Sequence, residues 1–167
     1  MIDWDILYKI PLGLYVLSAN DEKKNVGAII DAVMIASNQP CALAISCSNQ
    51  GYTKKAIDKT LVFNLSVLPK NIPPSIIANF GFFSSKDRNK WNFVKHQIFH
   101  NLPVIDDALV FIHAKVIHKY ELCSNTIFIA EIIEAKLNNN GDAILYQDYR
   151  DNLKNKVLKS YQQLKGE

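Results

Sequence analysis

The residues best suited to chemistry in this chain lie in one segment, Phe80–Trp91, which reads FGFFSSKDRNKW. Its aromatic rings offer flat apolar surfaces, and its hydroxyls and cations offer donors to an anion. This combination suits a ligand that carries a planar ring at one end and a phosphate at the other. The alternative is a solvated turn between two buried elements, because loops often mix aromatic and charged residues.

A second segment, Ser46–Lys55, has the features of an anion site. It passes from an apolar run through small polar residues to the expected start of a helix. Backbone N–H groups at a helix N-terminus have no partner inside the helix, and the helix dipole favours a negative charge there. The hydroxyls of Ser46, Ser48 and Thr53 could add to such a site, although a helix cap made by Thr53 alone is the alternative. Taken with the hydroxyl and lysine of the first segment, this pattern predicts one shared phosphate site.

Other kinds of active site have little support in the sequence. His96 and His100 are spaced to share one face of a helix, as zinc-binding histidines do, but they belong to no HExxH pattern. The sequence contains no Gly-x-Ser-x-Gly elbow, no Walker loop and no Rossmann glycine motif. We therefore expect no metal site and no catalytic acid, base or nucleophile.

Composition indicates a globular protein, since 49% of the 167 residues are hydrophobic and 21% are charged. The net charge of +3 comes from scattered basic residues, whereas nucleic-acid-binding proteins usually gather them on one face. The three cysteines form no CxxC pair, which suits a reducing cytosol. The chain has no signal-peptide pattern and no apolar run of membrane-spanning length. We expect a cytoplasmic protein without nucleic-acid or membrane partners.

Hydrophobic periodicity predicts many strands and few helices. The expected strands are 13–18, 25–35, 41–47, 61–68, 108–122 and 126–136, with the first two in a hairpin and with 143–146 pairing after an Asn-rich turn. The expected helices are 52–59, 74–79 and 149–165, while residues 92–101 fit neither pattern and should end at Pro103. These elements predict a single domain over residues 1–167, a mainly β, barrel-like fold with short helical insertions and a C-terminal helix.

Short motifs along residues 5–150 occur in a defined order. They are Tyr8-Lys9-Ile10, Gly13–Val16, Asn25, Ser37 with Pro40, Thr53 with Ile57, Phe63, Ser66–Leu68, Phe80–Phe82 with Ser84, Lys86, Asp87 and Lys90, Asn125–Ile132, Tyr146 and Tyr149. In that order they resemble the flavin reductase-like, FMN-binding split-barrel family. The branch they resemble contains flavoredoxin, ferric reductase and the flavin domain of high-molecular-weight rubredoxin.

The resemblance implies a split β-barrel that forms a homodimer and binds one FMN per subunit near the dimer interface. It also implies that the FMN phosphate is held by the helix start after the third strand and by a Ser-x-Lys loop, and that the ring lies along the second strand. The residues of this chain at those positions form the expected cofactor-binding set: Ile30, Asp31, Ala32, Val33, Ser46, Cys47, Ser48, Tyr52, Thr53, Phe83, Ser84 and Lys86. Strand 108–116 and the C-terminal helix are candidate dimer contacts, unless both pack in the subunit's own core.

The activity that the resemblance implies is that of an oxidoreductase, an NAD(P)H-dependent flavin reductase-like enzyme. Electrons would pass from NADH or NADPH through FMN to a small-molecule or protein acceptor, with the flavin carrying the chemistry. The second strand departs from the family, because relatives often have Asn-Thr-Val followed by Gln where this chain has Ile30–Met34. Asp31 accepts hydrogen bonds but cannot donate them when ionised. Two alternatives therefore stay open, a non-enzymatic flavin-binding electron-transfer module and a split barrel with a degenerate flavin site.

Overall fold

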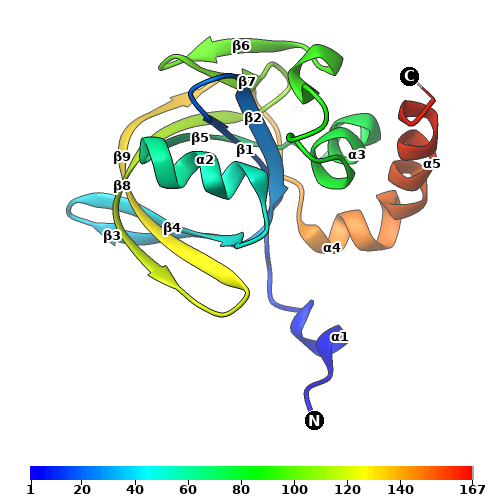
Figure 1. Cartoon of the computed structure of the whole chain (residues 1–167). Coiled ribbons are helices and arrows are strands. Elements are labelled where there is room, and N and C mark those ends of the chain that lie inside the picture. The colour runs from blue at the N-terminus through cyan, green and yellow to red at the C-terminus, as the bar shows by residue number, and fades with distance from the viewer. Residues whose placement is uncertain (167) are drawn as a thin grey trace.

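The computed structural model describes residues 1–166 (Figure 1), in which seven antiparallel strands form one curled sheet in the order β2-β1-β5-β8-β9-β4-β3. The strands are β1 (Tyr15–Asn20), β2 (Asn25–Ile30), β3 (Val33–Asn38), β4 (Cys41–Ser48), β5 (Val62–Val67), β8 (Val110–Glu121) and β9 (Asn125–Leu137), with β6 (His96–Phe99) and β7 (Leu102–Ile105) in a separate hairpin. The helices are α1 (Trp4–Leu7), α2 (Tyr52–Thr60), α3 (Pro74–Phe82), η1 (Lys90–Phe93), α4 (Tyr146–Asp148), η2 (Tyr149–Leu153) and α5 (Lys154–Leu164). No helix in the described part of the chain is long and apolar enough to cross a membrane.

The barrel closes because one stretch of chain belongs to both edges of the sheet. β2 pairs with β1 along its whole length, and the chain then turns at Asp31 and Ala32 and continues as β3, which pairs with β4. The N–H of Ser46 on β4 donates to the carbonyl oxygen of Ala32 at 3.0 Å, immediately before the β3 ladder begins. The prediction of one strand over 25–35 is therefore wrong, since these residues form two strands that serve opposite edges.

Most other predicted elements are confirmed within a few residues, including the β1–β2 hairpin and the strands β4, β5, β8 and β9. α3 is longer than predicted and includes Phe80–Phe82, because Phe80 is buried against the rest of the core. Residues 143–146 form only isolated bridges rather than a strand. The predicted helix 149–165 begins with one π-helical turn and continues as α5.

The β6–β7 hairpin accounts for the segment that fitted no pattern. Pro103 does not end the segment but lies inside β7, opposite Ile98. Buried polar residues of the main sheet hold the hairpin: the hydroxyl of Ser18 donates to the Pro103 carbonyl oxygen at 2.6 Å, and the N–H of Ile105 donates to Ser66 Oγ at 3.1 Å. His96 lies in β6 and His100 in the turn after it, so these two histidines share no helical face.

Alternate residues of the strands supply two apolar clusters. On β1, Val16 belongs to a cluster with α3 and α5, whereas Leu17 belongs to the barrel interior with α2. Burying each large apolar side chain contributes about 1.5–3 kcal/mol to folding. Phe111 of strand 108–116 and Val157 of the C-terminal helix both enter the first cluster, so these two candidate dimer contacts pack in the subunit's own core.

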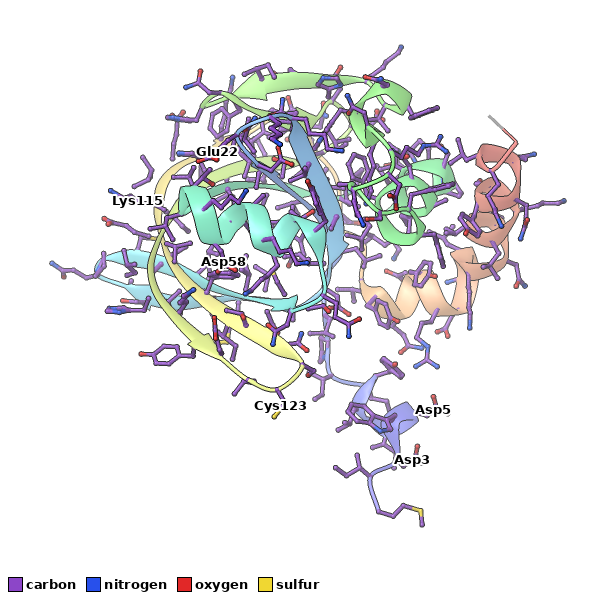
Figure 2. The ribbon with its side chains drawn as sticks, viewed as in Figure 1. Asp3, Asp5, Glu22, Asp58, Lys115 and Cys123 are labelled. Atoms are coloured by element: carbon purple, nitrogen blue, oxygen red, sulfur yellow. The ribbon has the colours of Figure 1, made fainter. Side chains whose placement is uncertain are left out.

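The N-terminal segment lies apart from the barrel. Figure 2 shows α1 below the sheet, with Asp3 and Asp5 directed away from it. Both carboxylates are exposed, and Arg150 Nη2 lies 3.2 Å from Asp5 Oδ1. Because this ion pair is at the surface, it adds little to stability.

β2 is an edge strand, and its free edge is sealed at Gly27. The Gly27 N–H donates to Ser85 Oγ at 3.1 Å, and the Gly27 carbonyl oxygen accepts from the Ser85 hydroxyl at 2.9 Å and from Lys90 Nζ at 2.8 Å. The buried rings of Phe80 and Trp91, with centroids 4.8 Å apart, lie directly over the glycine. A Cβ at this position would lie 2.8 Å from Phe80 Cε1 and 3.1 Å from Trp91 Cζ2.

We predict that Gly27→Ala lowers the free energy of unfolding by about 1–3 kcal/mol, because the added methyl group overpacks two buried rings. Urea unfolding measures this change. The matched control is Gly81→Ala, whose Cβ would lie at ordinary contact distance from Ile29, 3.7 Å from Cγ1 and 3.9 Å from Cβ. Since alanine favours a helix by up to about 1 kcal/mol over glycine, the control should be neutral or stabilising. Equal stability of the two variants would contradict the prediction.

Candidate functional site

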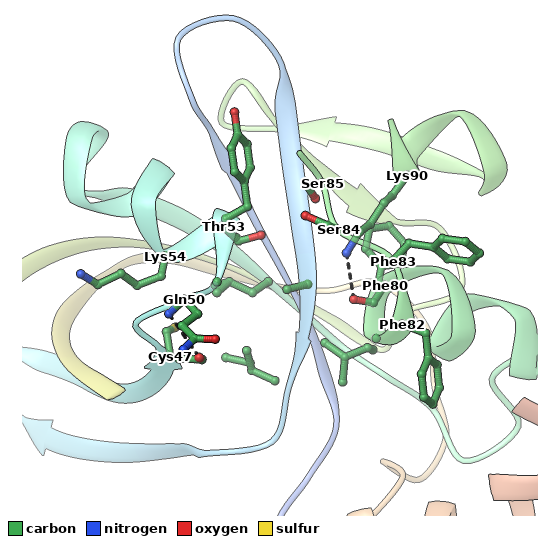
Figure 3. A pocket seen from close by; sticks show the side chains of 18 residues that line it. Cys47, Gln50, Thr53, Lys54, Phe80, Phe82, Phe83, Ser84, Ser85 and Lys90 are labelled. Atoms are coloured by element: carbon green, nitrogen blue, oxygen red, sulfur yellow. Dashed lines mark hydrogen bonds between the residues drawn. The ribbon is translucent and has the colours of Figure 1, made fainter. Parts of the chain in front are cut away.

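A pocket of about 420 Å³ opens between β2, the start of α2 and the end of α3 with its following loop. Figure 3 shows Thr53 and Lys54 of α2 on one side of β2, and Ser84, Ser85 and Lys90 on the other. The lining residues are Leu17, Ala28, Ile29, Ile30, Cys47, Ser48, Gln50, Gly51, Tyr52, Thr53, Lys54, Phe80, Gly81, Phe82, Phe83, Ser84, Ser85 and Lys90.

The first wall is the uncapped start of α2. The N-cap residue is Gly51, and no side chain within residues 1–166 caps the helix there. The first N–H groups of α2 therefore have no partner inside the helix and lie at the positive end of its dipole. Thr53, in the first turn, is buried and lines the pocket. This wall can donate hydrogen bonds to an anion.

The second wall is the end of α3 with the loop that seals β2. Lys90 Nζ donates to the carbonyl oxygens of Gly27 and Phe80, at 2.8 and 3.0 Å. Ser84 Oγ accepts from the N–H of Lys86 at 3.1 Å, which fixes the turn that presents the serine to the pocket. The wall thus brings two hydroxyls and one ammonium group to face the start of α2.

The charges of the lining are cationic. Lys54 and Lys90 are its two lysines, and the lining contains no aspartate, glutamate or histidine. Lys54 Nζ is 2.6 Å from Asp58 Oδ2, so its charge has a partner within α2. Burial raises the pKa of the Cys47 thiol to about 12, which keeps it protonated and unreactive at neutral pH. The pocket can hold an anion, and its own side chains offer no acid–base pair or activated nucleophile.

The turn between β1 and β2 joins the two walls. Asp21 Oδ2 accepts a hydrogen bond from the Tyr52 hydroxyl at 2.7 Å, and this bond lowers the pKa of Asp21 to about 2. On the other side, Lys24 Nζ donates to the carbonyl oxygen of Lys86 at 3.1 Å. The Asp21–Lys24 turn therefore ties α2 to the loop after α3 and fixes the width of the pocket between them.

The structure places the predicted binding residues in three groups. In the pocket lining it brings together Ile30, Cys47, Ser48, Tyr52, Thr53, Phe83 and Ser84. Three others, Ala32, Val33 and Ser46, line a second, apolar depression of about 240 Å³ with Leu12, Met34, Ala44, Ile45 and Ile127. Asp31 and Lys86 line neither space, and Lys86 is exposed.

Several lining residues were not predicted individually, although most lie within the two segments that the sequence singled out. Gln50, Gly51 and Lys54 belong to Ser46–Lys55, and five others belong to Phe80–Trp91, namely Phe80, Gly81, Phe82, Ser85 and Lys90. The signal for Lys90 was its place directly before Trp91, where the charged run meets an aromatic residue. Leu17, Ala28 and Ile29 gave no signal beyond the strand pattern.

Three comparisons with known proteins show the family and the fold of this chain. Residues 7–153 match the family described as Flavin reductase like domain. Ferric-chelate reductase (NAD(P)H) from Archaeoglobus fulgidus is 26% identical over 150 residues, which cover 89% of this chain and 89% of that protein. High molecular weight rubredoxin from Moorella thermoacetica is 25% identical over 150 residues, and the match spans 89% of this chain but 66% of the relative.

Among solved structures, the NADH:FAD oxidoreductase SgcE6 of Streptomyces globisporus has a TM-score of 0.77 at 18% identity, with 84% of each chain covered. At this identity the likeness concerns the fold, and it agrees with the mainly β architecture described above. The family match covers most of the chain, including both walls of the pocket. The predicted family and fold class are confirmed, and the chain belongs to the Flavin reductase like domain family.

Proposed function

We propose that this protein is an FMN-binding oxidoreductase that passes electrons from NADH or NADPH to a small-molecule or protein acceptor. The observation that carries the proposal is the pocket whose lining combines a free helix start, two lysines and three serines without any carboxylate. Such a lining suits a phosphate. Its position on a flavin reductase-like fold supports a phosphorylated flavin as the ligand.

The flavin phosphate would be held between the start of α2 and Ser84, and the ring would extend along Ile30–Val33. The apolar depression that contains Ala32 and Val33 adjoins this stretch and suits a planar apolar ring. Asp31, which precedes Ala32 in the chain, can accept a hydrogen bond from a ring N–H but cannot donate one to a ring carbonyl when it is ionised. Backbone N–H groups would then supply the donors that the side chains of β2 and β3 do not.

The bound flavin supplies the redox chemistry, and the residues of the chain bind and orient it. A role in binding rather than in proton transfer agrees with a pocket lining that has no acid–base pair. The printed name of the Archaeoglobus relative, ferric-chelate reductase (NAD(P)H), supports a reduced nicotinamide as the donor. SgcE6 is named for FAD, so FAD is the second candidate cofactor.

We predict that the purified protein binds added FMN and shows the visible absorbance of an oxidised flavin. Under anaerobic conditions, NADH or NADPH should bleach that absorbance, and the faster nucleotide identifies the donor. Absence of both native flavin and FMN binding would contradict the proposal. Bound flavin that neither nucleotide reduces would instead favour the electron-transfer module, and a stable protein that binds no flavin would favour the degenerate site.

We also propose that the protein forms a homodimer through the exposed edge strand β3. Met34 and Ile35 on β3 are 63% and 60% exposed, although both are large and apolar. β3 is an edge strand with a free ladder side, which a second copy could cover.

We predict a dimer in sedimentation velocity at micromolar concentration, and a monomer for the double variant Met34→Glu with Ile35→Glu, because two charges would be buried without partners. The matched control is Ile98→Glu, which changes an equally exposed isoleucine on the β6–β7 hairpin. The control should remain dimeric. A monomeric wild-type protein would exclude this interface.

A further inference from the structure

We propose that Lys90 is the residue through which this pocket selects a phosphorylated flavin over riboflavin. The inference rests on the proposed function and adds a selectivity that the binding of FMN alone does not require. It follows from three features of Lys90: it is buried in the wall of the pocket, it donates to two carbonyl oxygens, and its charge has no ion-pair partner within residues 1–166. Lys86, four residues earlier, is exposed and does not line the pocket.

Lys90 is a buried cation in the wall of the pocket. The residue is 3% exposed, and Figure 3 shows its ammonium group turned toward the end of α3, beside the two serines. It donates to the carbonyl oxygens of Gly27 and Phe80. An ammonium group has three donors, so one N–H is left for a further acceptor at the pocket.

The charge of Lys90 has no counter-charge among residues 1–166, since it forms no ion pair there. The two elements packed against its ammonium group, β2 and α3, contain no ionisable side chain. The charged or titratable groups around it are Lys86, Asp87 and Arg88 on its own loop, His96 beside Trp91, and Tyr52 and Lys54 on α2. Asp87, the one carboxylate of that set, is exposed.

An isolated buried ammonium group costs several kcal/mol of desolvation. Two carbonyl dipoles offset part of that cost, and the negative end of the α3 dipole at Phe80 helps. Burial still lowers the pKa of Lys90 to about 8. A phosphate dianion in the pocket would supply the missing counter-charge, whereas riboflavin carries no group that could.

This environment gives a pH dependence with a definite sign. A bound phosphate stabilises the charged ammonium group, so the pKa of Lys90 is higher in the FMN complex than in the free protein. Below about pH 8 the free protein already holds the proton, and affinity for FMN is constant once the phosphate is a dianion. Above that pH the free protein must take up a proton to bind, so the FMN dissociation constant rises up to tenfold per pH unit.

The test compares the affinity for FMN with the affinity for riboflavin. A defect in the shape or stability of the pocket would lower both affinities alike, whereas loss of a phosphate contact lowers only the affinity for FMN. Dissociation constants are measured by flavin fluorescence for wild type, Lys90→Gln and Lys95→Gln at fixed ionic strength. Glutamine can still donate to a carbonyl oxygen but carries no charge. Lys95→Gln is the matched control, an exposed lysine outside the pocket lining.

At pH 7.5 we expect wild type and Lys95→Gln to prefer FMN to riboflavin by roughly ten- to hundredfold, the range of one charge-assisted hydrogen bond. Lys90→Gln should reduce that preference to about threefold or less. Between pH 7 and 9.5 the FMN affinity of wild type should fall and that of Lys90→Gln should stay flat. The wild-type pH profile needs no variant, so it tests the inference even if Lys90→Gln does not fold.

Three outcomes would overturn the inference. Lys90→Gln could weaken the binding of FMN and of riboflavin by the same factor, which would show that Lys90 has only a structural role. The wild-type FMN affinity could stay constant through pH 9.5. Lys86→Gln could abolish the preference while Lys90→Gln retains it. Each of these leaves the proposed function standing, whereas a wild-type protein that binds neither flavin would remove the proposed function as well.

Discussion

The free edge of β2 is the constraint on which the rest of the structure depends. An unpaired strand edge exposes backbone groups that must find partners or invite pairing with another chain. Here Gly27 satisfies its outward N–H and carbonyl groups through Ser85 and Lys90. Because Gly27 has no side chain, Phe80 and Trp91 can close over it. The seal therefore positions the end of α3 and the loop that follows it.

The same seal makes one wall of the pocket. Residues that reach from the loop to the carbonyl oxygen of Gly27 must pass along the side of β2, and this brings Ser85 and Lys90 into the lining. The opposite wall is fixed separately, by α2 packing Ala56 and Ile57 into the barrel interior. The Asp21–Lys24 turn ties the two walls together. A binding site for an anion thus results from elements that the fold needs in any case.

The sequence predicted elements wherever local pattern and tertiary environment agree. β4 is mostly apolar, and its residues Ala42, Leu43, Ile45 and Cys47 are buried, so its pattern was sufficient. The change from β2 to β3 was hidden because the apolar residues continue across Asp31 and Ala32, and periodicity records which residues are apolar but not which edge they serve. Gly81 disfavours a helix by itself, yet the burial of Phe80 extends α3 past it. Pro103 sits in a short hairpin held by side chains from distant strands.

For the site, the sequence predicted which segments line the pocket but not which single residues within them do. Both segments that line the pocket could be found from residue types, because hydroxyls, cations and aromatic rings gather there. The choice between Lys86 and Lys90 could not, since both stand in one charged run and only the fold decides which is buried. Lys90 turns inward because the edge of β2 needs a donor at Gly27, not because a ligand needs a cation. The charge of Lys90 consequently has no ion-pair partner within residues 1–166, and a pocket beside such a charge favours an anion.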